Sequence, residues 1–394
     1  MPNVFDYLEW RGDLTFEESP LCDVDNLIFC LLSYVDLDGI VPADPCGERV
    51  TIRKAAAEYF FTHREESDRP LGLIVPADIL TLFRRMAMCT RYKDLPLTGY
   101  MSSTSEARAM QFCALTVWIA PEEAFVAFRG TDDSIVGWRE DFNLAYMDAI
   151  PSQRKAAQYL NGLDVTPDTK LYVGGHSKGG NLAVWGAVHA EERVRAQIVQ
   201  VYSNDGPGFS EGTVSSEAYR ALSDRIRIIL PDDSLVGLLL DHDERYTVVR
   251  SNRRGLFQHD GLSWEVLGSG FIPCEGLSKK GVYADTVVRR HIDAMSKEER
   301  RDFIRLMFTL IESTGAKTLT ELHAGKARAA LTMLRSFKEL PRQEQETVAY
   351  LWSKLVGGKE VRPRREHSAR DIRRARRPNR SGRVKVSVFP LLLP

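Results

Sequence analysis

The stretch Leu171-Tyr172-Val173-Gly174-Gly175-His176-Ser177-Lys178-Gly179-Gly180 decides how this chain folds. A short apolar run precedes a G-x-S-x-G pattern, and a helix-like segment, 181–190, follows it. In a nucleophile elbow a serine occupies a strained turn between a strand and a helix, and glycines two residues on either side prevent a clash. The pattern alone is short, so the strand and the helix that flank it carry the prediction. We expect Ser177 to project above a sheet edge as a nucleophile.

The alternative is a glycine-rich turn in which the serine is incidental. The two interpretations differ in what the rest of the chain must supply. A serine is a poor nucleophile unless a base removes its proton and a carboxylate orients that base. A nucleophilic Ser177 therefore predicts a histidine and an acid further along the chain. The backbone N–H of Lys178 would then help to hold the oxyanion.

Size and composition indicate a globular protein. The chain has 394 residues, of which 43% are hydrophobic and 27% charged, and it is longer than one compact core usually organises. Its first residues lack the basic and apolar regions of a secretory signal, and no run approaches roughly 18 apolar residues, so we expect a cytoplasmic protein. Six cysteines without C-x-x-C spacing indicate neither a disulfide framework nor a zinc site.

Charge is distributed unevenly along the chain. The last segment, 359–394, holds twelve Lys or Arg residues and three acids, a charge of +9, so the rest of the chain is −10 for a net charge of −1. Such a tail is either a solvated, disordered extension or an arm that binds nucleic acid or anionic lipid. We favour disorder, because the tail has no aromatic residue for base stacking before Phe389.

The pattern of elements divides the chain into four parts. Residues 1–100 are expected to form a mostly helical flank or cap, and 101–285 the α/β core. Residues 286–358 have long 3.6-residue periods, typical of a helical extension, and 359–394 form the basic tail.

Within the core, strand-like and helix-like stretches alternate. Residues 112–119 and 123–128 flank a Pro-Glu turn and predict an antiparallel hairpin. Further buried strands are expected at 198–202, 226–230 and 246–250. Alternation of this kind predicts an α/β fold with a mostly parallel sheet and helices on both faces.

The order of residues along the chain ranks the histidines. In folds with this elbow the acid and then the histidine follow the serine. His259, in the loop 257–261, is placed to reach back over the sheet edge as the base. His242 is the alternative, but it lies among the acids of 241–244. We therefore favour His259.

Three aspartates compete for the role of the acid. Asp233 is the first choice and Asp232 the second, because 230–234 directly follows a predicted strand and a triad acid emerges at such a strand end. Asp205, at the end of the preceding strand, is the third. Its Gly-Pro-Gly context, 206–208, favours the role of a turn residue that satisfies its own backbone.

The second oxyanion donor is expected in the loop after an earlier strand. Thr131 ends such a strand and would offer its backbone N–H together with its hydroxyl, unless it is a simple strand exit. The apolar residues of the following segment, 132–143, would either cover an acyl pocket or pack as an ordinary amphipathic turn.

Several stretches resemble the class 3, fungal-type lipases of the α/β-hydrolase fold: Phe128-Arg129-Gly130-Thr131, Trp138-Arg139-Glu140-Asp141-Phe142 and Gly175-His176-Ser177-x-Gly179-Gly180. The wider pattern is more similar still to a bacterial branch of that superfamily, the Mbeg-like hydrolases. The stretches that carry this similarity are Tyr7-Leu8-x-Trp10-Arg11-Gly12-Asp13, Ser203-Asn204-Asp205-Gly206-Pro207-Gly208 and Gln258-His259-Asp260-x-x-Ser263-Trp264.

The resemblance implies a role for each matching residue. Ser177 would be the nucleophile, His259 the base, and Thr131 and Lys178 the oxyanion donors, with 132–142 as the counterpart of the lipase lid. It implies an esterase or lipase that needs no cofactor.

Two positions depart from the lipase pattern. Lys178 stands where a leucine is usual, so that a cation would either favour an anionic substrate group or be solvated. In the lipases the acid precedes an apolar pair. When this chain is aligned with that pattern, Ser234 and not Asp233 stands at the acid's position, so the acid is displaced or missing.

The sequence thus predicts a serine hydrolase that cleaves a carboxylic ester of a small molecule or lipid, such as a lysophospholipid, through an acyl-enzyme. No stable membrane insertion and no nucleic-acid partner are expected. The alternative is a catalytically idle hydrolase fold that serves as a binding or scaffold protein.

Overall fold

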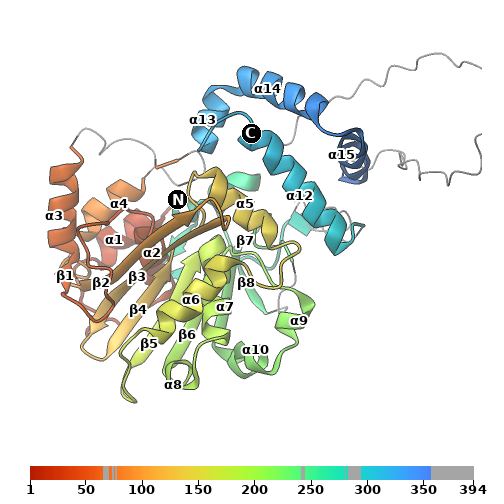
Figure 1. Ribbon diagram of the computed structural model, residues 1–394. Coiled ribbons are helices and arrows are strands. Elements are labelled where there is room, and N and C mark those ends of the chain that lie inside the picture. Colours follow the sequence, from red (N-terminus) through yellow and green to blue (C-terminus); the bar gives the residue numbers. More distant parts are fainter. Residues whose placement is uncertain are drawn as a thin grey trace, which may run out of the picture.

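A computed structural model describes residues 1–64, 71–72, 75, 78–240, 245–279, 281–282 and 294–355. The chain is built on one eight-stranded sheet whose strands follow each other in chain order (Figure 1). These strands are β1 (Val50–Thr51), β2 (Pro96–Ser105), β3 (Met110–Ala120), β4 (Glu123–Phe128), β5 (Lys170–His176), β6 (Ile198–Asn204), β7 (Ile226–Pro231) and β8 (Tyr246–Val249). A separate antiparallel pair joins β9 (Val266–Leu267) and β10 (Gly270–Phe271).

The sheet changes direction at β4. Strands β1 to β4 pair antiparallel, and β4 to β8 pair parallel. Helices lie in the connections from β4 to β5, from β5 to β6 and from β6 to β7. The expected hairpin is present as β3 and β4, in which Ala120 pairs with Glu123. This is the mostly parallel sheet, flanked by helices, that the alternation of elements predicts.

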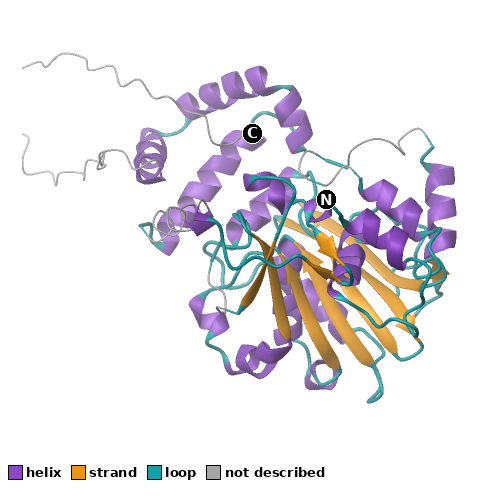
Figure 2. Ribbon diagram, turned by 180° about the vertical axis from the view of Figure 1, so that it is seen from behind, coloured by secondary structure: helices purple, strands orange, loops and turns teal. Residues whose placement is uncertain are grey.

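The helices lie on both faces of the sheet (Figures 1 and 2). Before β4 they are α1 (Val4–Arg11), α2 (Asp23–Leu32), α3 (Ile52–Thr62) and α4 (Ile79–Met86). After β4 they are α5 (Ile135–Asn143), α6 (Pro151–Asn161), α7 (Lys178–Val188), α8 (Glu192–Arg195), α9 (Glu211–Val214) and α10 (Glu217–Leu222). Short 3-10 helices are η1 (Ser223–Arg225), η2 (Gly255–His259) and η3 (Gly261–Ser263).

Side-chain alternation in the strands divides the core between these two sets of helices. Phe125 and Ala127 of β4 belong to the cluster that contains α1 to α4, whereas Val126 and Phe128 belong to the cluster that contains α6 and α7. Successive residues of a strand point to opposite faces, so a strand buried on both sides is apolar throughout. This explains why β4 reads as a continuous apolar run.

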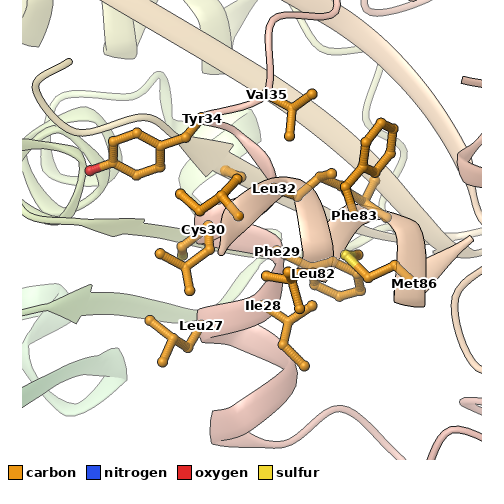
Figure 3. Close-up of a cluster of buried hydrophobic side chains, with 14 of the residues drawn as sticks. Leu27, Ile28, Phe29, Cys30, Leu32, Tyr34, Val35, Leu82, Phe83 and Met86 are labelled. Carbon is orange, nitrogen blue, oxygen red and sulfur yellow. The ribbon is translucent and has the colours of Figure 1, made fainter. Parts of the chain in front are cut away.

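Helices α1 to α4 make up less than half of the described part of the first hundred residues, and the apolar side chains of this segment belong to the main core. Apolar side chains of α2 pack against Leu82, Phe83 and Met86 of α4 (Figure 3). A buried ion pair between Asp25 and Arg91, with 2.6 Å between Oδ2 and Nη2, fastens the segment before β2 to α2. The segment also supplies β1 and most of the first half of β2, so the expected boundary at residue 100 falls inside a strand.

The C-terminal helices form an arch over one end of the sheet (Figure 1). They are α12 (Lys297–Glu312), α13 (Leu319–Ala324), α14 (Lys326–Glu339) and α15 (Arg342–Leu355). Gly325 ends α13 and begins α14. Beyond them, the basic tail at 359–394 lies outside the described residues, as does His242. Within the described residues, no helix is both long and apolar enough to cross a bilayer.

Candidate active site

Ser177 lies on the turn between β5 and α7, where the sequence places it. Its φ of 59° is a left-handed conformation that side chains rarely adopt, as expected of a strained elbow. A Cβ on Gly175 would lie 2.0 Å from the carbonyl carbon of Gly179, and one on Gly179 would lie 2.1 Å from the oxygen of Phe128. Only glycine fits at either position, so the G-x-S-x-G pattern is a structural requirement of this turn.

The acid beside His259 is Asp205. His259 ends η2, and its Nδ1 lies 2.6 Å from Oδ2 of Asp205, which follows β6 with a φ of 50°. The other oxygen, Oδ1, accepts hydrogen bonds from the hydroxyl of Ser234 and from the backbone N–H of Gly237 at 3.1 Å. Burial raises the pKa of Asp205, but the hydrogen bonds from His259 and Ser234 outweigh burial and hold it below its ordinary value. The carboxylate is therefore ionised and fully hydrogen-bonded.

The preference for Asp233 or Asp232 as the partner of His259 does not match this geometry. The carboxylate of Asp233 accepts hydrogen bonds from the Ser278 hydroxyl and, at 3.2 Å, from the backbone N–H of Gly255, where η2 begins. Oδ1 of Asp232 is buried and has no hydrogen-bond partner. Strands β6 and β7 are parallel neighbours, so their carboxyl ends share one edge, and the loops decide which carboxylate reaches the histidine.

The contacts of Ser234 account for the departure of this chain from the lipase pattern. This residue occupies the position at which the lipase pattern would place the acid, and its hydroxyl donates to Asp205. The carboxylate that contacts His259 follows the neighbouring strand β6, with Ser234 buried beside it. The turn role that the Gly-Pro-Gly context suggests for Asp205 is wrong as its main role, because its carboxylate bonds to groups distant in sequence.

His176, inside the elbow, supports the loop that carries His259. Its Nε2 lies 2.7 Å from the backbone carbonyl of His259 and its Nδ1 lies 3.2 Å from the hydroxyl of Tyr34. A carbonyl only accepts, so Nε2 donates to it and Nδ1 accepts from Tyr34. Burial, with the neighbouring His259, lowers the pKa of His176 to about 3, so the ring is neutral.

Lys178 neither faces a substrate group nor meets solvent, contrary to both expectations for its side chain. The side chain is 1% exposed, and Nζ donates to Oε2 of Glu140 at 3.1 Å and to the backbone and side-chain oxygens of Gln111 at 3.1 and 2.9 Å. Oδ1 of Asp141 lies 3.5 Å away. Burial lowers the pKa of Lys178, but Asp141 and Glu140 raise it further, so the pKa lies above its ordinary value. The ammonium group is charged and neutralised inside the protein.

The partners of Lys178 fix α5 in place. Glu140 is 0% exposed, and its two oxygens also accept from the backbone N–H groups of Gln111 and Ser152, each at 2.9 Å. Asp141 accepts from the hydroxyl of Thr131, and burial raises its pKa to about 6 despite the opposing effect of Lys178. Helix α5 is therefore joined to β3, α6 and the elbow by charged side chains.

A cavity of about 270 Å³ adjoins the elbow. Four residues singled out from the sequence line it, namely Ser177, His259, Thr131 and Lys178, and Asp205 lies behind His259. Most of the remaining lining residues are apolar: Val75, Trp138, Phe142, Leu144, Ala145, Pro207, Val236, Leu239, Leu240, Leu256, Met295, Phe303 and Ile304. Among the described residues, no three His, Cys, Asp or Glu side chains are grouped as metal ligands would be.

The parallel sheet, the elbow after β5 and the histidine–aspartate pair at the same sheet edge define an α/β-hydrolase fold. The chain belongs to the Mbeg1-like family, whose model matches residues 86–309, more than half of the sequence. The match runs from the end of α4 into α12.

Two solved lipase structures share a distant likeness with the chain. M37 lipase has 17% sequence identity and a TM-score of 0.31, with 54% of this chain and 68% of that chain covered. The native Rhizomucor miehei lipase propeptide complex has 13% identity and a TM-score of 0.32, with coverage of 64% and 82%. Likenesses this weak say nothing about the activity of this chain. Among curated proteins, none matches it in sequence.

Sequence reasoning ranked one residue of this site too low and missed two other features. Asp205, which contacts His259, was only the third candidate, although the serine at the acid's position was a signal in its favour. His176 had no signal, because the second position of G-x-S-x-G accepts any residue. The pairing of Lys178 with Glu140 joins positions 38 residues apart. Its one signal in the sequence was a lysine beside a buried elbow, because a buried charge needs a partner.

Proposed function

We propose that this protein is a serine hydrolase that cleaves carboxylic esters through an acyl-enzyme. Ser177 is the nucleophile, His259 the general base and acid, and Asp205 the carboxylate that orients it. The observation that carries the proposal is the 2.6 Å contact between His259 Nδ1 and Asp205 at a cavity that Ser177 also lines. Because Nδ1 is committed to Asp205, Nε2 is left to exchange a proton with the serine.

The reaction has two halves. His259 Nε2 takes the proton of Ser177 as Oγ attacks the ester carbonyl carbon, and the carbonyl electron pair moves to its oxygen. When this intermediate collapses, the alkoxide leaves and takes the proton from His259, and the acyl group remains on Ser177. Water then attacks the acyl carbon with His259 as its base, which releases the acid and restores the serine.

The developing oxyanion needs donors that are fixed in advance. The backbone N–H of Lys178, at the start of α7, and that of Thr131 are the proposed donors. The hydroxyl of Thr131 donates to Asp141, so its proton is engaged and the backbone group is the better candidate. The side chain of Lys178 takes no direct part, because its ammonium group is bound to Glu140 and Gln111.

Labelling with a fluorophosphonate tests the proposal. The folded protein is expected to form one adduct at Ser177, and Ser177→Ala none. Heat-unfolded protein provides the control, because only an activated serine reacts. A folded protein that stays unlabelled overturns the proposal.

The idle-scaffold alternative would be favoured by a His259 without a carboxylate or by a filled space next to Ser177. The geometry offers Asp205 at 2.6 Å and a cavity of about 270 Å³ instead. Both observations support an enzyme over a scaffold.

A further inference from the structure

Part of the apolar wall of the cavity comes from two helices that are distant in sequence. Trp138 and Phe142 of α5 face Phe303 and Ile304 of α12, the first helix of the C-terminal arch. Most polar lining groups lie around Ser177 and the histidines, and Arg300 of α12 also lines the cavity. The cavity thus has a reactive polar end and an apolar end between two helices.

A second, smaller cavity continues this apolar end. It measures about 50 Å³ and is lined only by apolar and aromatic side chains. Trp138, Phe142, Phe303 and Ile304 line both cavities, so the two cavities are neighbours. The space between α5 and α12 therefore extends beyond the main cavity.

Helix α12 is fastened to the domain as a fixed wall. An ion pair joins Arg139 of α5 to Glu312 of α12 with 2.8 Å between Nη1 and Oε1. The backbone N–H of Ile135 donates to the carbonyl of Lys317 at 2.9 Å, and Arg300 donates to the carbonyl of Ala145 at 3.2 Å. Contacts at both ends of α12 hold it against α5, and α5 is itself held by the buried Glu140.

From this arrangement we infer that the substrate's acyl chain lies between α5 and α12, and that the enzyme prefers unbranched, uncharged acyl groups of medium length. The inference rests on the proposed function for the position of the ester at Ser177. A cavity of roughly 150 Å³ accepts benzene, with six carbons, so about 270 Å³ accommodates about ten. Each methylene that enters the apolar end should raise kcat/KM about fourfold, and chains beyond about ten carbons should gain nothing.

Two substitutions at Ile304 test the inference in opposite directions. Hydrolysis of p-nitrophenyl esters with two to sixteen carbons would be measured for the native protein, Ile304→Trp and Ile304→Ala. The native optimum is expected near ten carbons. Ile304→Trp should move it shorter by three or more carbons, and Ile304→Ala should move it longer by about two. Arg301→Trp, on an exposed position of the same helix, is the matched control and should leave the profile unchanged.

Binding of decanoate separates failure of this inference from failure of the proposed function. Calorimetry on the folded proteins needs no turnover, and Ile304→Trp is expected to weaken decanoate binding at least tenfold while Arg301→Trp does not. If Ser177 stays unlabelled but decanoate binds in this pattern, the acyl site stands and the esterase does not. If Ser177 is labelled but the chain-length profile is flat or indifferent to Ile304, the acyl site between α5 and α12 is wrong.

Discussion

Replacement of Lys178 by methionine isolates one buried charge. Methionine fills nearly the same volume, so the substitution removes the ammonium group without a large cavity. Glu140, 0% exposed, and Asp141, 22% exposed, would then lose their cation. Removal of one partner from a buried pair costs about 3–5 kcal/mol, because it leaves an uncompensated charge in the interior. Against a typical domain stability of about 5–15 kcal/mol, this is a large loss.

The double variant Lys178→Met with Glu140→Gln distinguishes charge from packing. Glutamine keeps one carbonyl oxygen, so it satisfies only one of the two backbone N–H groups, of Gln111 and Ser152, that Glu140 accepts from. We expect the double variant to lose about 1–3 kcal/mol, less than Lys178→Met alone, because the charge of Glu140 is gone. One unpaired N–H remains, and Asp141 still lacks the cation. The two substitutions are therefore not additive.

Urea denaturation, followed by circular dichroism and by tryptophan fluorescence, measures both effects. Lys178→Met should lower the midpoint without changing the slope, and the double variant should recover part of the loss. Lys317→Met breaks the ion pair with Glu106 at an exposed site and should leave the midpoint unchanged. A Lys178→Met protein with the native midpoint would refute the reasoning that this ion pair holds α5 against the elbow.

Two further predictions concern the histidines and their acid. Asp205→Asn should lower kcat about 10⁴-fold, whereas Asp233→Asn should change kcat less than tenfold, because only Asp205 contacts His259. Equal effects of the two substitutions in an esterase assay would show that the assignment of Asp205 as the acid is wrong. The neutral, buried His176 should make the protein less stable in acid. Its pKa falls from 6.5 to about 3 on folding, so between these pH values only the unfolded chain binds the proton. In this range the group contributes a decrease of about 1.4 kcal/mol in unfolding free energy for each pH unit of acidification. His176→Gln, which keeps a donor for the His259 carbonyl, should remove that share of the slope, and an unchanged slope in pH-dependent urea titrations would exclude a neutral His176.

Local sequence signals were sufficient wherever the structure is built from neighbours in the chain. The apolar run 171–173 and the glycines of the elbow dictate a strand, a tight turn and a helix, because only glycine fits beside Gly179 and Phe128. The hairpin of β3 and β4 follows from two apolar stretches on either side of a Pro-Glu turn. His259 followed from chain order, since the fold leaves few later histidines at the correct sheet edge.

By itself, the sequence determined the α/β fold, the position of Ser177 at its elbow and the histidine at the same edge. Tertiary structure alone decided the rest. Asp205 and Asp233 both follow parallel strands, so the choice between them depends on how the loop that carries His259 packs. The burial of the Lys178 ammonium group depends on its ion pair with Glu140. The apolar lining of the cavity depends in part on Ile304, which lies more than a hundred residues after Ser177 in the chain. Burial energies of this kind depend on groups that meet only after the chain has folded, and no local pattern encodes them.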